Sequence, residues 1–309
     1  MNKICSLPWN TISLDSDGGQ RACCNYTGKR KEWEQDGKIH SIRPLSIKSV
    51  TSLDSLKNSQ YLKDVRKDLL NNKWPPACLR CKDMEESNIE SFRQKANKRF
   101  PETFSKILKE QKDTFISTKY LELDLTNRCN AACFMCGAWS SSLWAKHTGS
   151  EERAWSDKID TLFDDIQEVE TIHIFGGEPL IQDEFYYFIN KLIDLDLSKN
   201  IDLLFNTNGS MLHKKDLLDT LRKFKSVNIG ISMDGIENMY NYIRWPLLWN
   251  QFQKNVNNFL NVIMEDRPFR KPQFKNKGTI SCSFSITLQT INIFNIIYFF
   301  CNYDKFFTK

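Results

Sequence analysis

The sequence contains no apolar run long enough to span a bilayer, which takes about 20 consecutive apolar residues. Its longest candidate, Ile291–Phe300, is too short and contains Asn292 and Asn295. The N-terminus, MNKICSLPWN, also lacks the apolar segment that follows the basic start of a signal peptide. These absences predict a cytoplasmic protein that has no membrane partner and lies where thiols stay reduced.

Glycine and proline are scarce, at 12 and 9 of 309 residues, and no internal repeat or low-complexity segment is evident. Hydrophobic residues at 40% and charged residues at 26% are ordinary for a globular protein, which excludes a disordered chain, a collagen and a coiled coil. The net charge of +5 is small, so no nucleic acid is expected as a partner. At about 150 residues per domain, the length predicts two domains.

Cysteine is the residue type that stands out, with 10 in the chain. That content is far below the level of a small disulfide-bonded scaffold. In a reducing compartment, cysteines more often bind metals or take part in catalysis than form bridges. The spacing of the cysteines is therefore the main guide to function.

The first part of the chain predicts a small mixed α and β region. Two strands, Trp9–Leu14 and Gln20–Tyr26, flank a turn at Asp17-Gly18-Gly19 and predict a β-hairpin. Leucine and valine recur near a 3.6-residue period over 53–73 and predict a helix. The charged stretch 82–115 is predicted to be helical and to join two domains.

Beyond residue 119, predicted strands alternate with predicted helices. This alternation indicates parallel βαβ units with right-handed crossovers. In such folds the chemistry sits in loops at the carboxyl ends of the strands. The strands are expected at 120–125, 171–175, 201–206, 227–233 and 279–288, and the helices at 159–168, 183–195, 214–224, 251–264 and 291–300.

Three closely spaced cysteines follow the first of these strands. Cys129, Cys133 and Cys136 have the spacing C-x3-C-x2-C. Thiolates are the usual ligands of iron–sulfur clusters, and three of them leave one iron of a [4Fe–4S] cube without a protein ligand. Zinc is the alternative, but zinc sites usually have four Cys or His ligands, and no histidine follows before His147.

This loop resembles the cluster-binding loop of the radical SAM superfamily, whose cofactor is S-adenosylmethionine (SAM). Three further segments resemble motifs of that family, in the family's order, and each ends one of the next three predicted strands. They are Gly176-Gly177-Glu178-Pro179, Asn206-Thr207-Asn208-Gly209 and Ser232-Met233-Asp234-Gly235.

The resemblance implies a role in SAM binding for each segment. The first receives the methionyl amino group through its carbonyls and glutamate, the second lies near the cofactor, and the third touches the ribose and carboxylate. Arg244 stands where relatives carry an arginine that pairs with the SAM carboxylate, and Met135 stands where a residue packs by the adenine. The implied SAM-binding residues are Met135, Gly176, Gly177, Glu178, Pro179, Asn208, Ser232, Asp234 and Arg244.

The cysteines of the first 81 residues resemble the twitch domain, a shortened SPASM domain that holds an auxiliary [4Fe–4S] cluster. Its implied ligands are Cys5, Cys23, Cys78 and Cys81. Because side chains alternate along a strand, Cys23 and its neighbour Cys24 should point to opposite faces, with only one of them a ligand. The turn register favours Cys23, and Cys24 is expected in the core. Zinc is again the alternative for a four-cysteine site.

The resemblance also implies a fold and an activity. The expected fold is α/β: a partial (β/α)6 TIM-type barrel over 119–309, apparently truncated before its last strand, preceded by a twitch domain over 1–85 and a helical linker over 86–118. The expected enzyme cleaves SAM reductively, and the resulting 5′-deoxyadenosyl radical abstracts hydrogen from a peptide, protein or small-molecule substrate. An electron donor such as flavodoxin or ferredoxin is implied as a partner.

Two other interpretations stay open at this point. One is a non-catalytic module that binds zinc or another metal through its cysteines and a partner through its surface. The other is an inactive fragment, because only five of six expected strands are counted before the chain stops. Cys282 and Cys301 lie in apolar segments and are expected to be buried.

Overall fold

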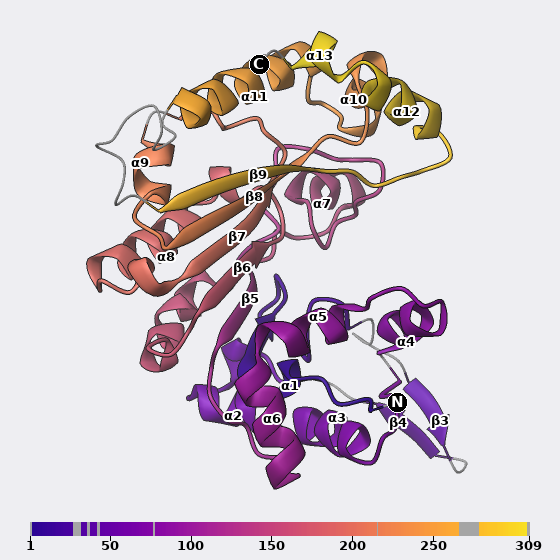
Figure 1. Cartoon of the computed structure of the whole chain (residues 1–309), viewed down its shortest axis with the longest axis vertical. Coiled ribbons are helices and arrows are strands. Elements are labelled where there is room, and N and C mark those ends of the chain that lie inside the picture. The colour runs from indigo at the N-terminus through magenta and orange to yellow at the C-terminus, as the bar shows by residue number, and fades with distance from the viewer. Residues whose placement is uncertain are drawn as a thin grey trace. The chain divides into compact units, whose positions relative to one another are not determined.

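The structure is a computed structural model of the chain, and it describes residues 2–26, 32–35, 38–41, 44–76, 78–214, 216–265 and 278–307. The chain divides into two compact units (Figure 1). Unit 1 comprises Met1–Leu123 and Asp157–Glu170, and unit 2 comprises Asp124–Ser156 and Thr171–Lys309. Within the described residues, no helix has the length and apolar character needed to cross a membrane.

The described residues of unit 1 include three strands that pair side by side. The hairpin is confirmed: β1 (Thr11–Leu14) pairs antiparallel with β2 (Gln20–Arg21), and β5 (Tyr120–Asp124) adds to β1 in parallel. Asp15 closes the hairpin turn, because its carboxylate accepts the backbone N–H groups of Asp17 at 3.0 Å and Gly19 at 2.9 Å. A separate antiparallel pair is formed by β3 (Glu32–Gln35) and β4 (Lys38–Ser41).

The hairpin strands are shorter than the sequence predicts. Trp9 lies in the short helix α1 (Leu7–Asn10), which has Pro8 in its first turn, where proline is tolerated. The second strand ends at Arg21, so Cys23 and Cys24 lie in a turn. The expected strand alternation of these two cysteines was therefore wrong, and their environments must be compared directly.

The remaining elements of unit 1 are mostly helical. The helix predicted over 53–73 is interrupted at Ser59, whose hydroxyl accepts the N–H of Leu62 at 3.3 Å and starts a second helix. The stretch expected to join two domains forms helices that belong to unit 1. The helical elements are η1 (Ile47–Ser49), α2 (Leu53–Lys57), α3 (Gln60–Leu70), α4 (Leu79–Glu86), α5 (Phe92–Arg99), α6 (Pro101–Glu110) and the 3-10 helix η2 (Ser156–Asp165).

Where unit 2 is described, it contains four parallel strands: β6 (Thr171–Phe175), β7 (Asp202–Thr207), β8 (Ser226–Ser232) and β9 (Thr279–Ser285). Each pairs in parallel with the next, in chain order. The predicted α/β class with a mostly parallel sheet is confirmed. Parallel strands place all their carboxyl ends at one edge, so the loops after β6, β7 and β8 emerge on the same side. In the described part of the chain, β9 is the last strand.

The helices of unit 2 cover this sheet through apolar faces. In α8, Phe185, Phe188 and Leu192 are fully buried, and the Phe185 ring lies 5.3 Å from that of Phe205 on β7. The helical elements are α7 (Ser142–Thr148), η3 (Pro179–Ile181), α8 (Asp183–Asp194), η4 (Ser198–Asn200), α9 (Leu217–Leu221), α10 (Glu237–Ile243), α11 (Trp249–Glu265), α12 (Ile293–Cys301) and α13 (Tyr303–Phe306).

This part of the chain differs from the sequence analysis in three respects. The segment 159–168 forms the 3-10 helix η2, with Ile159 and Leu162 buried three residues apart, and it belongs mostly to unit 1. Cys301 is exposed, and Cys282 is only half-buried. Helices α7 and α10 were not predicted, because seven residues are too few to establish a helical period.

A buried ion pair stabilises the helices of unit 1. The Arg93 guanidinium lies 2.7 Å from the Glu85 carboxylate, and both side chains are almost fully buried. Arg93 also donates to the carbonyl of Ile4 at 2.7 Å, beside Cys5. Burial alone would raise the pKa of Glu85, but hydrogen bonds from Arg93 and Ser91 hold it below its ordinary value. The charged pair therefore fixes the Cys5 segment against α4 and α5.

We expect Glu85→Gln to lower the free energy of unfolding by about 3 kcal/mol at pH 7, because it leaves Arg93 buried without its partner. The pKa of Glu85 is lower in the folded than in the unfolded protein. Its stabilisation is thus complete above about pH 4.3, the unfolded value, and is lost as the pH falls through the folded value. Urea unfolding followed by tryptophan fluorescence should show the difference between variant and wild type shrinking below about pH 4.

The matched control is Glu86→Gln on the same helix, since the Glu86 side chain is 64% exposed. It should change stability by less than about 0.5 kcal/mol at any pH. Equal effects of the two substitutions would contradict the assigned ion pair.

Candidate functional site

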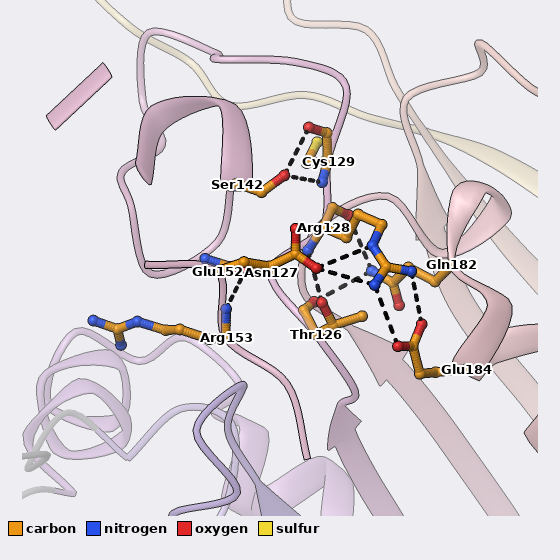
Figure 2. Close-up of polar contacts among 9 residues, drawn as sticks. All are labelled: Thr126, Asn127, Arg128, Cys129, Ser142, Glu152, Arg153, Gln182 and Glu184. Atoms are coloured by element: carbon orange, nitrogen blue, oxygen red, sulfur yellow. Dashed lines mark hydrogen bonds and ion pairs between the residues drawn. The ribbon is translucent and has the colours of Figure 1, made fainter. Parts of the chain in front are cut away.

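The three-cysteine loop lies in unit 2 and is fixed by polar side chains (Figure 2). The Ser142 hydroxyl accepts the N–H of Cys129 at 3.1 Å and donates to the carbonyl of Cys129 at 3.3 Å. The buried Asn127 donates to the carbonyl of Ala138 at 2.8 Å and accepts the N–H of Arg153 at 2.8 Å. Both ends of the loop are therefore anchored on α7 and the segment that follows it.

Arg128 joins this loop to the segments around it. Its guanidinium lies 3.0 Å from Glu152 and 3.2 Å from Glu184, the latter in the first turn of α8 (Figure 2). Its backbone carbonyl accepts the N–H of Glu178 at 2.9 Å. The residue directly before Cys129 thus contacts the glycine turn after β6 through its main chain.

Gln182 is a site residue that the sequence analysis missed. Its fully buried side-chain amide donates to the carbonyls of Thr126 at 3.2 Å, Arg128 at 3.2 Å and Gly176 at 3.3 Å (Figure 2). Two of these carbonyls belong to the cysteine loop, and the third belongs to the glycine turn. One side chain therefore satisfies buried backbone groups of both segments and holds them together.

The two glycines of this turn are required by its backbone. Gly176 and Gly177 have φ values of 73° and 49°, in the left-handed region that glycine adopts most readily. A Cβ atom on Gly177 would lie 2.1 Å from the carbonyl oxygen of Arg128. The close approach of the turn to the cysteine loop thus depends on the missing side chain.

Glu178 is fully buried behind the turn. Its carboxylate accepts the hydroxyl of Thr207 at 2.7 Å and the backbone N–H groups of Asn208 at 2.6 Å and Leu180 at 3.2 Å. Burial raises the pKa of Glu178, and these three donors oppose that effect. Glu178 therefore connects the turn after β6 to the loop after β7.

Asn208 extends this connection to the cysteine loop. Its side-chain amide donates to the Asn130 side chain at 2.8 Å, and its oxygen accepts the N–H of Ser210 at 2.9 Å. Asn130 in turn donates to the Ser210 hydroxyl at 3.1 Å. The loops after β5, β6 and β7 are thus joined by a continuous set of hydrogen bonds.

The loop after β8 brings a buried ion pair to the cysteines. Asp234 has φ 52° and is fully buried, and its carboxylate contacts the Arg244 guanidinium and accepts the N–H of Thr287 at 2.5 Å. Arg244 Nη1 also lies 3.7 Å from Cys133 Sγ. Three other residues predicted to bind SAM lie in the cysteine loop, after the glycine turn and at the end of β8. Pro179 is buried, and Met135 and Ser232 are half-buried.

The three thiols of the loop differ electrostatically. A hydrogen bond from Cys136 lowers the pKa of Cys133 to about 7, and the Arg244 charge acts in the same direction against burial. Burial and the nearby Glu178 carboxylate raise the pKa of Cys129 to about 12. The hydrogen bond to Cys133 raises the pKa of Cys136. Cys133 is therefore the cysteine of this loop that is held closest to its thiolate form.

The donor set fits an iron–sulfur cluster with three protein ligands. All ten cysteines lie in the described part of the chain and are free thiols. No three His, Cys, Asp or Glu side chains among the described residues are arranged to hold a single metal ion. Cysteine thiolates are the usual ligands of such clusters. Three thiols on one anchored loop could bind three irons of a four-iron cube and leave the fourth iron without a protein ligand.

The cysteines of unit 1 form a second group. Cys5, Cys23 and Cys78 pack against one apolar cluster, and Cys81 is buried in the first turn of α4. Burial raises the pKa of Cys5 to about 12, and the neighbouring Cys81 adds to this effect. Burial raises the pKa values of Cys23 and Cys78 most. Glu122, Cys24, Cys5 and Cys78 add to the effect at Cys23, and Cys5 and Cys81 add to it at Cys78. The four implied auxiliary ligands therefore lie near one another.

Cys24 has a different environment. Its backbone N–H donates to the carboxylate of Glu122 at 2.6 Å, and Glu122 is fully buried on β5. Burial raises the pKa of Glu122, and hydrogen bonds from Cys24 oppose the rise. Cys24 is thus held toward Glu122, whereas Cys23 packs with Cys5 and Cys78.

The Gly177→Ala substitution tests how closely the turn approaches the cysteine loop. Gly149 ends α7 with φ 68° and has open space around its Cα, so Gly149→Ala is the matched control. We expect Gly149→Ala to cost about 1 kcal/mol of stability, for the left-handed backbone alone. Gly177→Ala should cost about 2 kcal/mol more, because the Cβ overlaps the Arg128 carbonyl. Equal losses in urea unfolding would contradict the close approach.

Comparison with known proteins agrees with the site. Residues 123–264 match the family model described as Radical SAM superfamily. The GTP 3',8-cyclase of Aliarcobacter butzleri is 32% identical over 115 residues, covering 36% of this chain and 34% of that protein. The cyclase of Campylobacter lari is 31% identical over 121 residues, covering 38% and 35%. An uncharacterized protein of Methanocaldococcus jannaschii is 28% identical over 123 residues, covering 38% and 40%.

Among solved structures, Streptococcus suis SuiB bound to S-adenosylmethionine aligns with a TM-score of 0.42 and 15% identity, covering 86% of this chain and 56% of that chain. The chain spans only about a third of the length of the curated cyclases that it matches. The matched region contains the cysteine loop, the glycine turn and Arg244. The prediction is confirmed at the level of this segment: residues 123–264 match a radical SAM superfamily domain, and this match and the cyclase relatives point to an enzyme.

Proposed function

We propose that this protein is a radical SAM enzyme in which Cys129, Cys133 and Cys136 hold a [4Fe–4S] cluster with one open iron. The observation that carries the proposal is the joining of the three-cysteine loop to the Gly176-Gly177-Glu178 turn, through the Arg128 carbonyl and the Gln182 amide. When bound, the cluster supplies one electron that cleaves SAM to methionine and a 5′-deoxyadenosyl radical, which abstracts hydrogen from the substrate.

The protein's own residues orient the cofactor in this proposal. The glycine turn offers backbone carbonyls and Glu178 to the methionyl amino group, and the loop after β7 lies beside it. Glu178 already accepts hydrogen bonds from Thr207 and Asn208, so it would share its oxygens with SAM. The further proposed SAM-binding residues are Met135, Pro179, Asn208, Ser232, Asp234 and Arg244.

We further propose that Cys5, Cys23, Cys78 and Cys81 hold an auxiliary [4Fe–4S] cluster in a twitch-like domain over residues 1–85. The mutual proximity and burial of these four thiols support this proposal. Four cysteine ligands would leave no iron open to substrate, so the cluster would suit electron transfer. The contact of Cys24 with Glu122 favours Cys23 as the fourth ligand. The radical SAM resemblance also implies a partial barrel over 119–309 and a flavodoxin or ferredoxin as electron donor. The free cysteines suit a reducing compartment, so we propose a cytoplasmic location.

The substrate class stays broad in this proposal: a peptide, a protein or a small molecule. Two of the named relatives are GTP 3',8-cyclases, and the chain spans about a third of their length. A zinc-binding module and an inactive fragment are the competing interpretations. Anaerobic reconstitution separates both of them from a radical SAM enzyme.

Anaerobic reconstitution tests the central proposal. We expect a brown protein with about eight irons and eight sulfides per chain, corresponding to two four-iron clusters. With SAM and dithionite it should form 5′-deoxyadenosine. Cys133→Ala should lose about four irons and all of this product, whereas Cys301→Ser, at an exposed cysteine, should lose neither. A colourless zinc protein, or no product above the Cys133→Ala background, would contradict the proposal.

The auxiliary ligand set has its own test. Cys23→Ser should reduce the iron content by about four per chain and leave the SAM-binding cluster in place. Cys24→Ser is the matched control at the neighbouring position, and it should retain full iron because Cys24 is held by its hydrogen bond to the Glu122 carboxylate. Iron loss in Cys24→Ser and not in Cys23→Ser would reverse the assignment.

A further inference from the structure

We propose that Arg244 is a positioning residue that acts through Cys133: its guanidinium, held by Asp234, donates an N–H···S hydrogen bond to the Cys133 sulfur and raises the reduction potential of the cluster bound there. This inference rests on the proposed function, since it concerns the cluster of the three-cysteine loop. It differs from the role that the family resemblance implies for Arg244, which is to pair with the carboxylate of SAM.

The main chain fixes Arg244 opposite Cys133. The N–H of Ala132 donates to the carbonyl of Trp245 at 2.8 Å, and the N–H of Phe134 donates to the carbonyl of Ile243 at 2.8 Å. These two bonds join the residues on either side of Cys133 to the residues on either side of Arg244. The two central residues therefore face each other across a short paired segment, independently of their side-chain conformations.

The side chain of Arg244 is aimed by an acidic partner. One terminal nitrogen contacts the carboxylate of Asp234, and the other lies 3.7 Å from Cys133 Sγ. Asp234 is itself fixed, because it is fully buried and accepts the N–H of Thr287 at 2.5 Å. One terminal nitrogen of the planar guanidinium is thus held by Asp234, and the other faces the Cys133 sulfur.

This arrangement has a direct consequence for a bound cluster. Hydrogen bonds to cluster sulfurs and the net charge nearby set the reduction potential of an iron–sulfur cluster. The reduced cluster carries one more negative charge than the oxidised one, so a cation and an N–H donor at its ligand stabilise the reduced form more. Because the Arg244 side chain is only 12% exposed, water screens this effect little.

The two roles of Arg244 separate when SAM is absent. A residue that tunes the cluster through Cys133 changes the potential of the SAM-free protein. A residue that only pairs with the SAM carboxylate leaves that potential unchanged and weakens SAM binding. We therefore measure the potential without SAM, by electron paramagnetic resonance during a mediated titration with dithionite, which supplies the single electron.

The variants are Arg244→Met, which removes charge and donors, and Arg244→Lys, which keeps the charge but lacks the planar guanidinium. Arg222→Met is the control, because Arg222 precedes β8, at the opposite end of that strand from Asp234, and pairs with Asp219. The signal of interest is the one that Cys133→Ala abolishes, and the remaining signal serves as an internal reference. Iron and sulfide contents are measured for every variant.

We expect Arg244→Met to shift the potential of this signal to a more negative value, Arg244→Lys to give an intermediate value, and Arg222→Met to match the wild type. If Arg244→Met binds less iron, Arg244→Lys and Arg244→Gln carry the same comparison at full loading. An unchanged SAM-free potential in fully loaded variants overturns the inference, including the case in which only SAM affinity falls. A wild-type protein without iron would instead overturn the proposed function.

Discussion

The candidate site depends on a single meeting of backbone segments, the contact of the three-cysteine loop with the glycine turn after β6. The Arg128 carbonyl accepts the N–H of Glu178, and the Gln182 amide donates to carbonyls of both segments. Buried carbonyl groups without donors are costly, so these bonds stabilise one relative position of loop and turn. The absence of a side chain at Gly177 allows the approach.

The other loops of the site are connected to this contact one after another, in the order of their strands in the sheet. Glu178 carries the connection to the loop after β7, and Asn208 returns it to the cysteine loop through Asn130. The loop after β8 adds the Asp234–Arg244 pair, in which Arg244 contacts the Cys133 sulfur. A parallel sheet makes this possible, because its strands deliver successive loops to one edge. Cys133 then faces a cation that is itself paired with the Asp234 carboxylate, which lets charge remain buried at the site.

The sequence alone predicted much of this arrangement, for reasons that can be named. Strands such as β6 were predicted correctly because a compact apolar run bounded by turn residues is a local signal. The three cysteines of the loop were identified from their spacing, and the other motif residues from their resemblance to radical SAM motifs. Gln182 was missed because its three acceptors lie up to 56 residues away in the chain. Cys23 and Cys24 were placed in a strand because the end of β2 is decided by tertiary contacts, among them the bond from Cys24 to Glu122. The break at Ser59 was hidden by leucines that continue the helical period across it.

The most direct test of the central claim is electron–nuclear double resonance on the reduced protein with SAM labelled with 15N at its amino group. The account predicts a hyperfine coupling between that nitrogen and the cluster of Cys129, Cys133 and Cys136, because the fourth iron is open to the cofactor. The coupling should be absent when Cys133 is replaced. A fully loaded, reduced cluster that shows no coupling to labelled SAM would contradict the account.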